Sequence, residues 1–226
     1  TVDIILSSIS QGLLWSVMAI GVYLTFRILD IADMTAEGSY PLGAAVCATG
    51  IVNGLNPLLA TFLAMIAGMG AGLISGLLHT KLKIPALLTG IVTLTGLYSI
   101  NLKILGKANV ALLKQETLVT QLQDFGLAKT NAVLVIGIIF VLAVVGVLTL
   151  LLNTQIGLAI RSTGDNIPMS EANGINVDRM KIYGYMISNG LIALCGALLT
   201  QNNGYADLNS GTGTIVIGLA SVIIDE

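Results

Sequence analysis

The feature that most limits how this chain can fold is the run from Asn131 to Leu152, which contains no charged residue. A helix needs about 20 apolar residues to cross the roughly 30 Å hydrocarbon layer of a bilayer, and this run supplies them. In the whole chain 55% of residues are hydrophobic and 10% are charged, and the mean hydropathy is +0.91. One soluble core cannot hide so much apolar surface. The sequence therefore predicts an all-α integral membrane protein, a polytopic helical bundle forming one domain over residues 1–226.

Other apolar runs repeat this pattern, and polar stretches separate them. The run 41–52 is too short for a full crossing and predicts a broken or re-entrant segment, which is tolerated at membrane depth only where it lines a cavity or is buried in protein. A second short run, 213–224, also follows a polar stretch, and two such broken segments are a pointer to a central translocation site. Because the chain ends inside this run, we expect further spans in the native protein. The predicted spans are residues 4–28, 41–52 (short), 57–78, 85–105, 131–152, 182–200 and 213–224 (partial).

Polar side chains within or beside these runs are candidates for lining a solute pathway. Hydroxyl and amide groups within spans also form hydrogen bonds between helices, and carboxylates before a short span can lie in an interfacial loop. A pathway role and a structural or interfacial role therefore both stay open. The candidate pathway residues are Asp33, Thr35, Glu37, Ser39, Thr93, Thr95, Asn189 and Asp207.

The long polar interruption in the second half of the chain, residues 157–181, has the capping residues of short helices. Asp165 or Asn166 can cap a helix whose first turn holds Pro168, and Gly174 can end it after roughly two turns. Asn176 can cap the next helix. We call residues 157–181 the coupling segment, because a short capped helix between two spans suits docking to a separate protein, although a solvated loop with ordinary caps has the same spacing.

Basic residues favour one orientation by a small margin. If the loop at His79 and the coupling segment face the cytoplasm, six Lys and Arg residues lie inside and four outside. This orientation places the amino terminus and residues 106–130 outside.

Several function classes lack support in the residues. The two cysteines, Cys47 and Cys195, have no CxxC or histidine spacing, so we expect packed thiols and no metal site. No basic face for nucleic acid and no nucleotide-binding motif is present, so we expect no bound cofactor and no enzymatic activity in this chain.

Four stretches together resemble a known family: RILDIADMTAEGSYPLGAA, GLAIRSTGDN, GINVDRMKIYGYMISNGLIALCGALL and GYADLNSGTGTIVIGLASVII. They are similar to the permease subunits of bacterial ABC importers of the branched-chain amino acid and ribose permease superfamily, and most of all to a compact branch associated with receptors of the tryptophan/tyrosine type. The resemblance covers nearly the whole chain. One departure is Asp225, where the family pattern leads us to expect glycine.

The resemblance implies a type II importer-like permease in the bacterial cytoplasmic membrane that moves a small solute, an aromatic or branched-chain amino acid, by alternating access. Implied partners are a second permease copy in a homodimer, cytoplasmic ATPases that bind ATP and Mg, an external solute-binding protein and membrane lipid. The pathway residues would approach the dimer axis. The competing class is an ion-coupled secondary transporter or facilitator, in which Asp33, Glu37 or Asp207 would bind the ion. The residues expected in or beside the helix that meets the ATPase are Arg161, Gly164, Asp165, Asn166, Glu171, Gly174 and Ile175.

Overall fold

The structure is a computed structural model, which describes residues 2–25, 35–106, 109–111, 117, 121, 124, 126, 129–203 and 205–207. Within these residues the regular structure is helical apart from one short two-stranded ribbon, and turns connect the helices. The predicted all-α polytopic bundle is confirmed. The elements are α1 (Val2–Tyr23), α2 (Ala36–Val52), α3 (Pro57–Thr80), α4 (Ala86–Leu105), β1 (Asn109–Ala111), α6 (Lys129–Leu152), α7 (Gln155–Asp165), α8 (Ile167–Ala172), α9 (Val177–Asn203) and β2 (Tyr205–Asp207).

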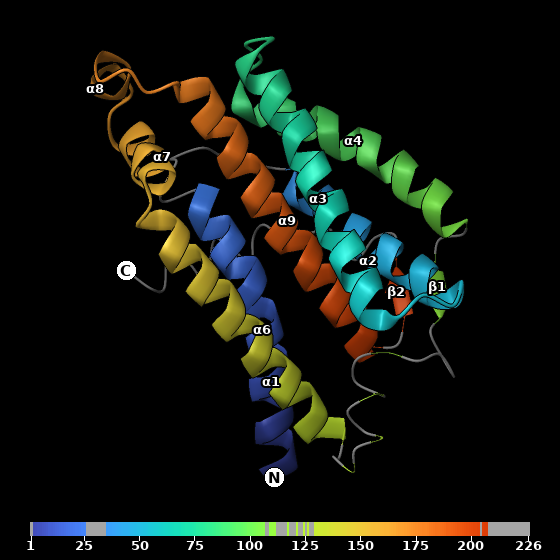
Figure 1. Cartoon of the computed structure of the whole chain (residues 1–226). Helices are drawn as coiled ribbons and strands as arrows, with labels where there is room; N and C mark the ends of the chain where they lie inside the picture. The colour runs from blue at the N-terminus through green and yellow to red at the C-terminus, as the bar shows by residue number, and fades with distance from the viewer. Residues whose placement is uncertain are drawn as a thin grey trace.

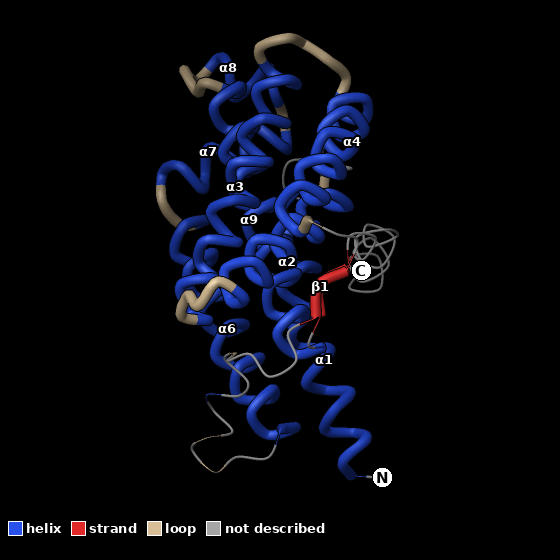
Figure 2. Tube along the Cα trace, turned by 90° about the vertical axis from the view of Figure 1, so that its right-hand side faces the viewer, coloured by secondary structure: helices blue, strands red, loops and turns tan. Residues whose placement is uncertain are grey.

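Helix α9 is the centre of the bundle. It packs along α1, α2 and α3, while α6 packs along α1 and α4 covers the outer side of α2 (Figure 1). Helices α7 and α8 lie at the end where α9 begins, and the antiparallel ribbon of β1 and β2 follows its other end (Figure 2). Five helices of the described chain, α1, α3, α4, α6 and α9, are long and apolar enough to cross a membrane.

Glycines allow α9 to approach its neighbours closely. Gly68, Gly72 and Gly76 recur every four residues on α3 and are buried. A Cβ atom at Gly68 or Gly72 would overlap the backbone of α9 at Asn189 or Tyr185. Small residues at four-residue spacing permit such close backbone contact in membranes, where apolar side chains gain little by leaving lipid.

The second helix differs from the predicted short run at 41–52. Helix α2 has 17 residues and begins at Ala36, so the polar residues before Pro41 are helical and Pro41 lies inside the helix. Its residues are almost all buried among α3, α4 and α9. The helix can begin among polar residues because protein and not lipid surrounds it.

The other predicted ranges differ from the observed helices mainly at their ends. Helix α9 begins at Val177, five residues before the predicted span, because Asn176 caps it inside the coupling segment: the amide of Arg179 donates to Asn176 Oδ1 at 3.2 Å. Residues 26–28 of the first predicted span and the whole partial span 213–224 lie outside the described residues.

Candidate functional site

The coupling segment folds as two short helices set against the start of α9. Helix α7 begins after Thr154, whose hydroxyl accepts a hydrogen bond from the amide of Gly157 at 3.3 Å. Gly157 lies so close to the backbone of Leu151 and Leu152 that a Cβ atom there would overlap it. The inner face of α7 is fixed by Ile160, which is fully buried and packs with Tyr185 of α9.

One extended residue, Asn166, separates α7 from α8. Its φ and ψ are −156° and 105°, and its Oδ1 accepts a hydrogen bond from the amide of Met169 at 3.0 Å, so it ends one helix and caps the next. Pro168 lies in the first turn of α8, where its missing N–H costs little. Gly174 follows α8 with φ +82°, a left-handed conformation that glycine adopts without a Cβ penalty.

Two further contacts join α8 to α7 and to the turn before α9, and we call the two short helices together the α7–α8 unit. Ser162 Oγ and Ser170 Oγ lie 2.5 Å apart across the two helices. The amide of Ile175 donates to the carbonyl of Ser170 at 3.0 Å, which closes the turn toward α9.

The seven predicted coupling residues lie together at this end of the bundle. Arg161 is exposed on α7, Asp165 and Asn166 are exposed at the break, and Glu171 is exposed on α8. Gly164 and Ile175 are half-buried, and Gly174 is exposed in the turn.

Sequence reasoning missed two features of this surface. It did not predict that α7 begins at Gln155, although Thr154 followed by Gly157 is a capping signal. It did not single out Ile167 and Met169, which are 40% and 46% exposed on α8. The signal that could have identified them is a pair of apolar residues in a short polar stretch outside the predicted spans, where no hydrophobic core requires apolar side chains.

The second group of candidate residues forms a buried polar contact region between α2, α3 and α9. Ser39 Oγ donates to Asn189 Oδ1 at 2.6 Å, and Asn189 Nδ2 donates to the carbonyl of Tyr185 at 2.8 Å. Thr35 Oγ1 and Ser75 Oγ share a hydrogen bond of 2.9 Å. Thr35, Ser39, Ser75 and Asn189 are each 0% exposed. In this conformation these four residues, which we call the polar core, join the helices.

The two threonines predicted on α4 face opposite ways. Thr93 is buried, whereas Thr95 is exposed and donates to the carbonyl of Ile91 on its own helix at 2.9 Å. Two residues along a helix correspond to about 200°, which explains the difference. Within the described chain Thr93 Oγ1 has no hydrogen-bond partner, nor has Oδ1 of Asn101, whose Nδ2 donates to the carbonyl of Gly38 at 3.3 Å.

Neither Glu37 nor Asp207, the two predicted carboxylates among the described residues, belongs to the polar core. Glu37 is half-buried in the first turn of α2. Asp207 is the last residue of β2, where it pairs with Asn109 beyond the opposite end of α9. Asp33 lies outside the described residues.

Other buried polar contacts on α9 were not predicted. Gln201 Nε2 donates to Thr61 Oγ1 of α3 at 2.7 Å, and Ser188 Oγ donates to the carbonyl of Gly21 in α1 at 2.6 Å. Isolated polar residues near the middle or end of an apolar run are the signal that identifies them. Within the described residues no group of three His, Cys, Asp or Glu side chains is placed to hold a metal ion.

The family of the chain follows from comparison with known proteins. The sequence profile described as "Branched-chain amino acid transport system / permease component" matches residues 4–224. The chain belongs to this permease family. The family match favours the predicted class, a permease subunit of an ATP-driven importer in the cytoplasmic membrane, over an ion-coupled secondary transporter.

Individual relatives agree with this assignment. The tyrosine transport system permease protein of Clostridioides difficile is 44% identical over 97% of this chain and 72% of its own length. A protein of Rickettsia prowazekii of uncharacterised function is 35% identical over 98% of the chain and 76% of its own length. The autoinducer 2 import system permease protein LsrC of Yersinia enterocolitica is 27% identical over 99% of the chain and 60% of its own length. No solved structure matches the chain.

Proposed function

We propose that the exposed side of α7 and α8 docks on a cytoplasmic ATPase and passes its movement to α9. The observation that carries the proposal is the α7–α8 unit, which lies at one end of the central helix and is joined to its start. Its exposed surface combines charged residues, Arg161, Asp165 and Glu171, with the apolar side chains of Ile167 and Met169. An apolar centre with a charged rim is the usual composition of a protein–protein interface.

Movement of this unit would act on the pathway through α9. Ile160 joins α7 to α9 through its contact with Tyr185, and the turn at Gly174 joins α8 to the start of α9. Asn189 lies about three turns along α9 from that start. Rotation or translation of α9 therefore changes the geometry of the Ser39–Asn189 contact. Packed helices shift between discrete arrangements, which suits alternating access.

The solute pathway in this proposal runs beside α2. When α2 separates from α9 or α4, the polar groups of Thr35, Glu37, Ser39, Thr93 and Asn189 become available to a solute, and Thr93 Oγ1 already lacks a partner in the described chain. Asp207, which lies beyond the end of α9 opposite the α7–α8 unit, would act at the outer side of this route. Thr95, on the opposite face of α4, would meet the solute only at an interface with a second copy.

We further propose an aromatic amino acid as the solute, because the relative that is 44% identical is a tyrosine transport permease. The complete importer would contain two copies of this chain, two ATPase subunits that bind ATP and Mg, and an external solute-binding protein. The binding protein would be mainly responsible for recognising the solute, and ATP hydrolysis by the ATPases would supply the energy.

The docking proposal is tested by placing a charge in the apolar centre of the α8 surface. Met169→Asp should reduce co-purification of the ATPase and tyrosine uptake by at least about tenfold, because a buried unpaired carboxylate costs more than about 1.4 kcal/mol. Lys81→Asp, an exposed change in the loop between α3 and α4, is the matched control and should retain both. Normal ATPase binding by Met169→Asp would refute the proposal.

The orientation is tested separately with Glu171→Cys, an exposed position on α8; the native Cys47 and Cys195 are buried. An impermeant maleimide should label this cysteine in inverted membrane vesicles and not in intact cells. Labelling in intact cells would place α8 outside and would exclude a cytoplasmic ATPase as its partner.

A further inference from the structure

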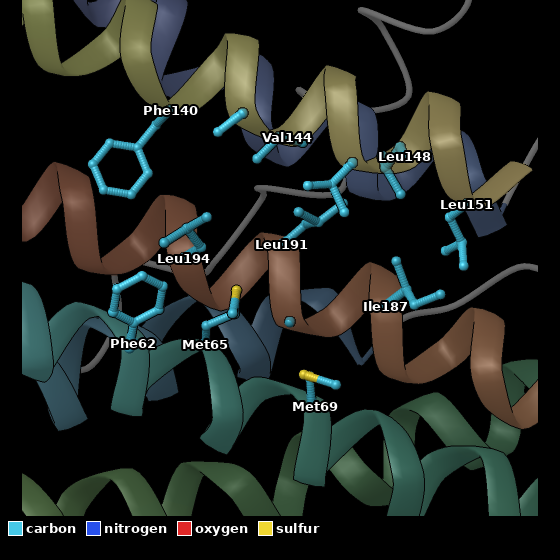
Figure 3. A pocket seen from close by; sticks show the side chains of 13 residues that line it. Phe62, Met65, Met69, Phe140, Val144, Leu148, Leu151, Ile187, Leu191 and Leu194 are labelled. Carbon is cyan, nitrogen blue, oxygen red and sulfur yellow. The ribbon is translucent and has the colours of Figure 1, made fainter.

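An apolar groove of about 320 Å³ runs between α3, α6 and α9, outside the polar core. Its floor is formed by α9 and its two walls by α3 and α6. Figure 3 shows Phe140, Val144 and Leu148 on one side and Phe62, Met65 and Met69 on the other, with Leu191 and Leu194 of α9 between them. The lining residues all have apolar side chains or are glycine. We call this hollow the lipid-facing groove, since its walls belong to helices that can cross the membrane.

The groove continues toward the coupling segment. A second hollow of about 210 Å³ shares Met69, Leu151 and Ile187 with the first and adds Ile156 of α7 and Tyr183 and Met186 of α9. Along α9 the combined groove extends from Tyr183 to Leu194. It therefore begins close to the α7–α8 unit and passes the middle of the bundle.

The length of the groove fits an acyl chain. Tyr183 to Leu194 corresponds to about 16 Å of helix, close to half of the roughly 30 Å hydrocarbon layer and so to one leaflet. The groove offers about 320 Å³ in its main part. Such a space accommodates a single flexible chain.

The end near the coupling segment carries a positive charge. Arg179 and Tyr183 are four residues apart on α9 and therefore share one face, and both are exposed. Arg179 lies about 6 Å along the helix from the Tyr183 end of the groove, toward the level of lipid headgroups. A guanidinium group pairs with phosphate by two parallel hydrogen bonds, and a tyrosine hydroxyl can donate a third. Asp178, the neighbouring acid, lies about 100° around the helix from Arg179.

We propose that one anionic phospholipid occupies this groove, with an acyl chain between α3 and α6 and its phosphate at Arg179 and Tyr183. The leaflet in which it lies rests on the proposed function, because the cytoplasmic position of α8 makes it the cytoplasmic leaflet, where anionic headgroups attract basic residues. The lipid would couple the surrounding bilayer to the helix that the ATPase moves.

The acyl-chain part is tested with two valines on α6. Val147 lines the groove and is 64% exposed, whereas Val145 is 45% exposed and lies outside both hollows. Val147→Phe should reduce the fraction of purified chain that retains phosphatidylglycerol in native mass spectrometry by about tenfold, since exclusion of two methylene groups suffices for that change. Val145→Phe makes the same substitution on another face of α6 and should retain the lipid as the unmodified chain does.

The headgroup part is tested by exchanging lipids in nanodiscs of phosphatidylglycerol or phosphatidylcholine before extraction. Arg179→Gln should lower the retained phosphatidylglycerol about fivefold and abolish its preference over phosphatidylcholine. Lys81→Gln, a loss of charge at the same end in another loop, should keep the preference.

Three results would overturn the proposal. The first is that neither the unmodified chain nor Val145→Phe retains phospholipid. The second is that Val147→Phe retains as much phospholipid as the unmodified chain. The third is an inter-chain disulfide formed by Val147→Cys, which would place a second protein helix in the groove. Lipid retention is measured on the isolated chain and does not depend on the ATPase. A lipid-free groove therefore leaves the docking proposal standing, and failed docking leaves the groove proposal standing apart from its leaflet.

Discussion

Helices α6 and α9 have similar lengths and opposite surroundings. Within their most apolar stretches of 18 residues, 83% of α9 is buried but only 22% of α6. Helix α6 has no charged residue between Asn131 and Leu152, whereas α9 contains Ser188, Asn189 and Gln201, all of them buried. The more apolar of the two helices therefore lies at the outside, and the more polar one at the centre.

The difference follows from the solvent. Lipid is as apolar as leucine, so a lipid-facing helix gains nothing by burial of its aliphatic side chains. A central helix is held by close backbone contact and by polar groups that find partners on other helices. In this chain the glycines of α3 and the contacts of Ser39 and Thr61 supply those interactions, and the same central helix receives the α7–α8 unit.

The largest expected effect tests close packing at α9. Gly72→Leu should destabilise the fold by more than about 3 kcal/mol, because its side chain would have to displace the backbone of α9 at Tyr185. Unfolding in mixed detergent micelles, followed by circular dichroism, measures the change.

Gly70, two residues away on the same helix, has no atom within 4 Å of a Cβ position. Gly70→Leu should leave stability unchanged or raise it by roughly 0.5–1 kcal/mol, since glycine is a poor helix former. Equal loss in both variants would mean that α3 and α9 do not meet along the glycine face.

A smaller effect tests whether α6 has one packed face only. Ile136 is 6% exposed and belongs to the core shared with α1 and α9, while Ile138 is 42% exposed. Ile136→Ala should cost about 2 kcal/mol through lost packing, and Ile138→Ala less than about 0.5 kcal/mol. The same unfolding measurement applies. If Ile138→Ala is the more costly change, α6 has its outer face against protein.

The sequence was sufficient where the deciding interactions are local. Asn166, Pro168, Gly174 and Asn176 predicted the α8 helix and the start of the next helix, because caps act within a few residues. The four-residue spacing of Gly68, Gly72 and Gly76 is also a local feature, because the helical period places the three glycines on one face of α3. The helical period alone also sets Thr93 and Thr95 on opposite faces of α4.

The sequence was insufficient where partners lie far apart along the chain. Thr35 pairs with Ser75 and Ser39 with Asn189, separations of 40 and 150 residues. Without those partners the polar start of α2 resembles a loop, so the helix was expected to begin at residue 41. The groove between α3, α6 and α9 and the Ser162–Ser170 contact likewise depend on tertiary packing.

The smallest effect measures what the polar core contributes to the difference between α6 and α9. Ser39→Ala removes the donor and Asn189→Ala the acceptor of the 2.6 Å hydrogen bond. In a double-mutant cycle the two changes should be coupled by about 0.6–1.7 kcal/mol, the range for interhelical hydrogen bonds in membranes. Ser39→Ala paired with Ile138→Ala, which lies on α6, should show no coupling.

Transport assays provide a second test of the contact between Ser39 and Asn189. If the contact between Ser39 and Asn189 must open for solute to pass, Ser39→Ala should leave the fold intact and change the rate of amino acid uptake by up to about tenfold, the factor that corresponds to 1.4 kcal/mol. A coupling energy of zero would mean that Ser39 and Asn189 do not hold α2 to α9. The close contact of glycine with backbone would then account for the central position of α9 without help from the polar core.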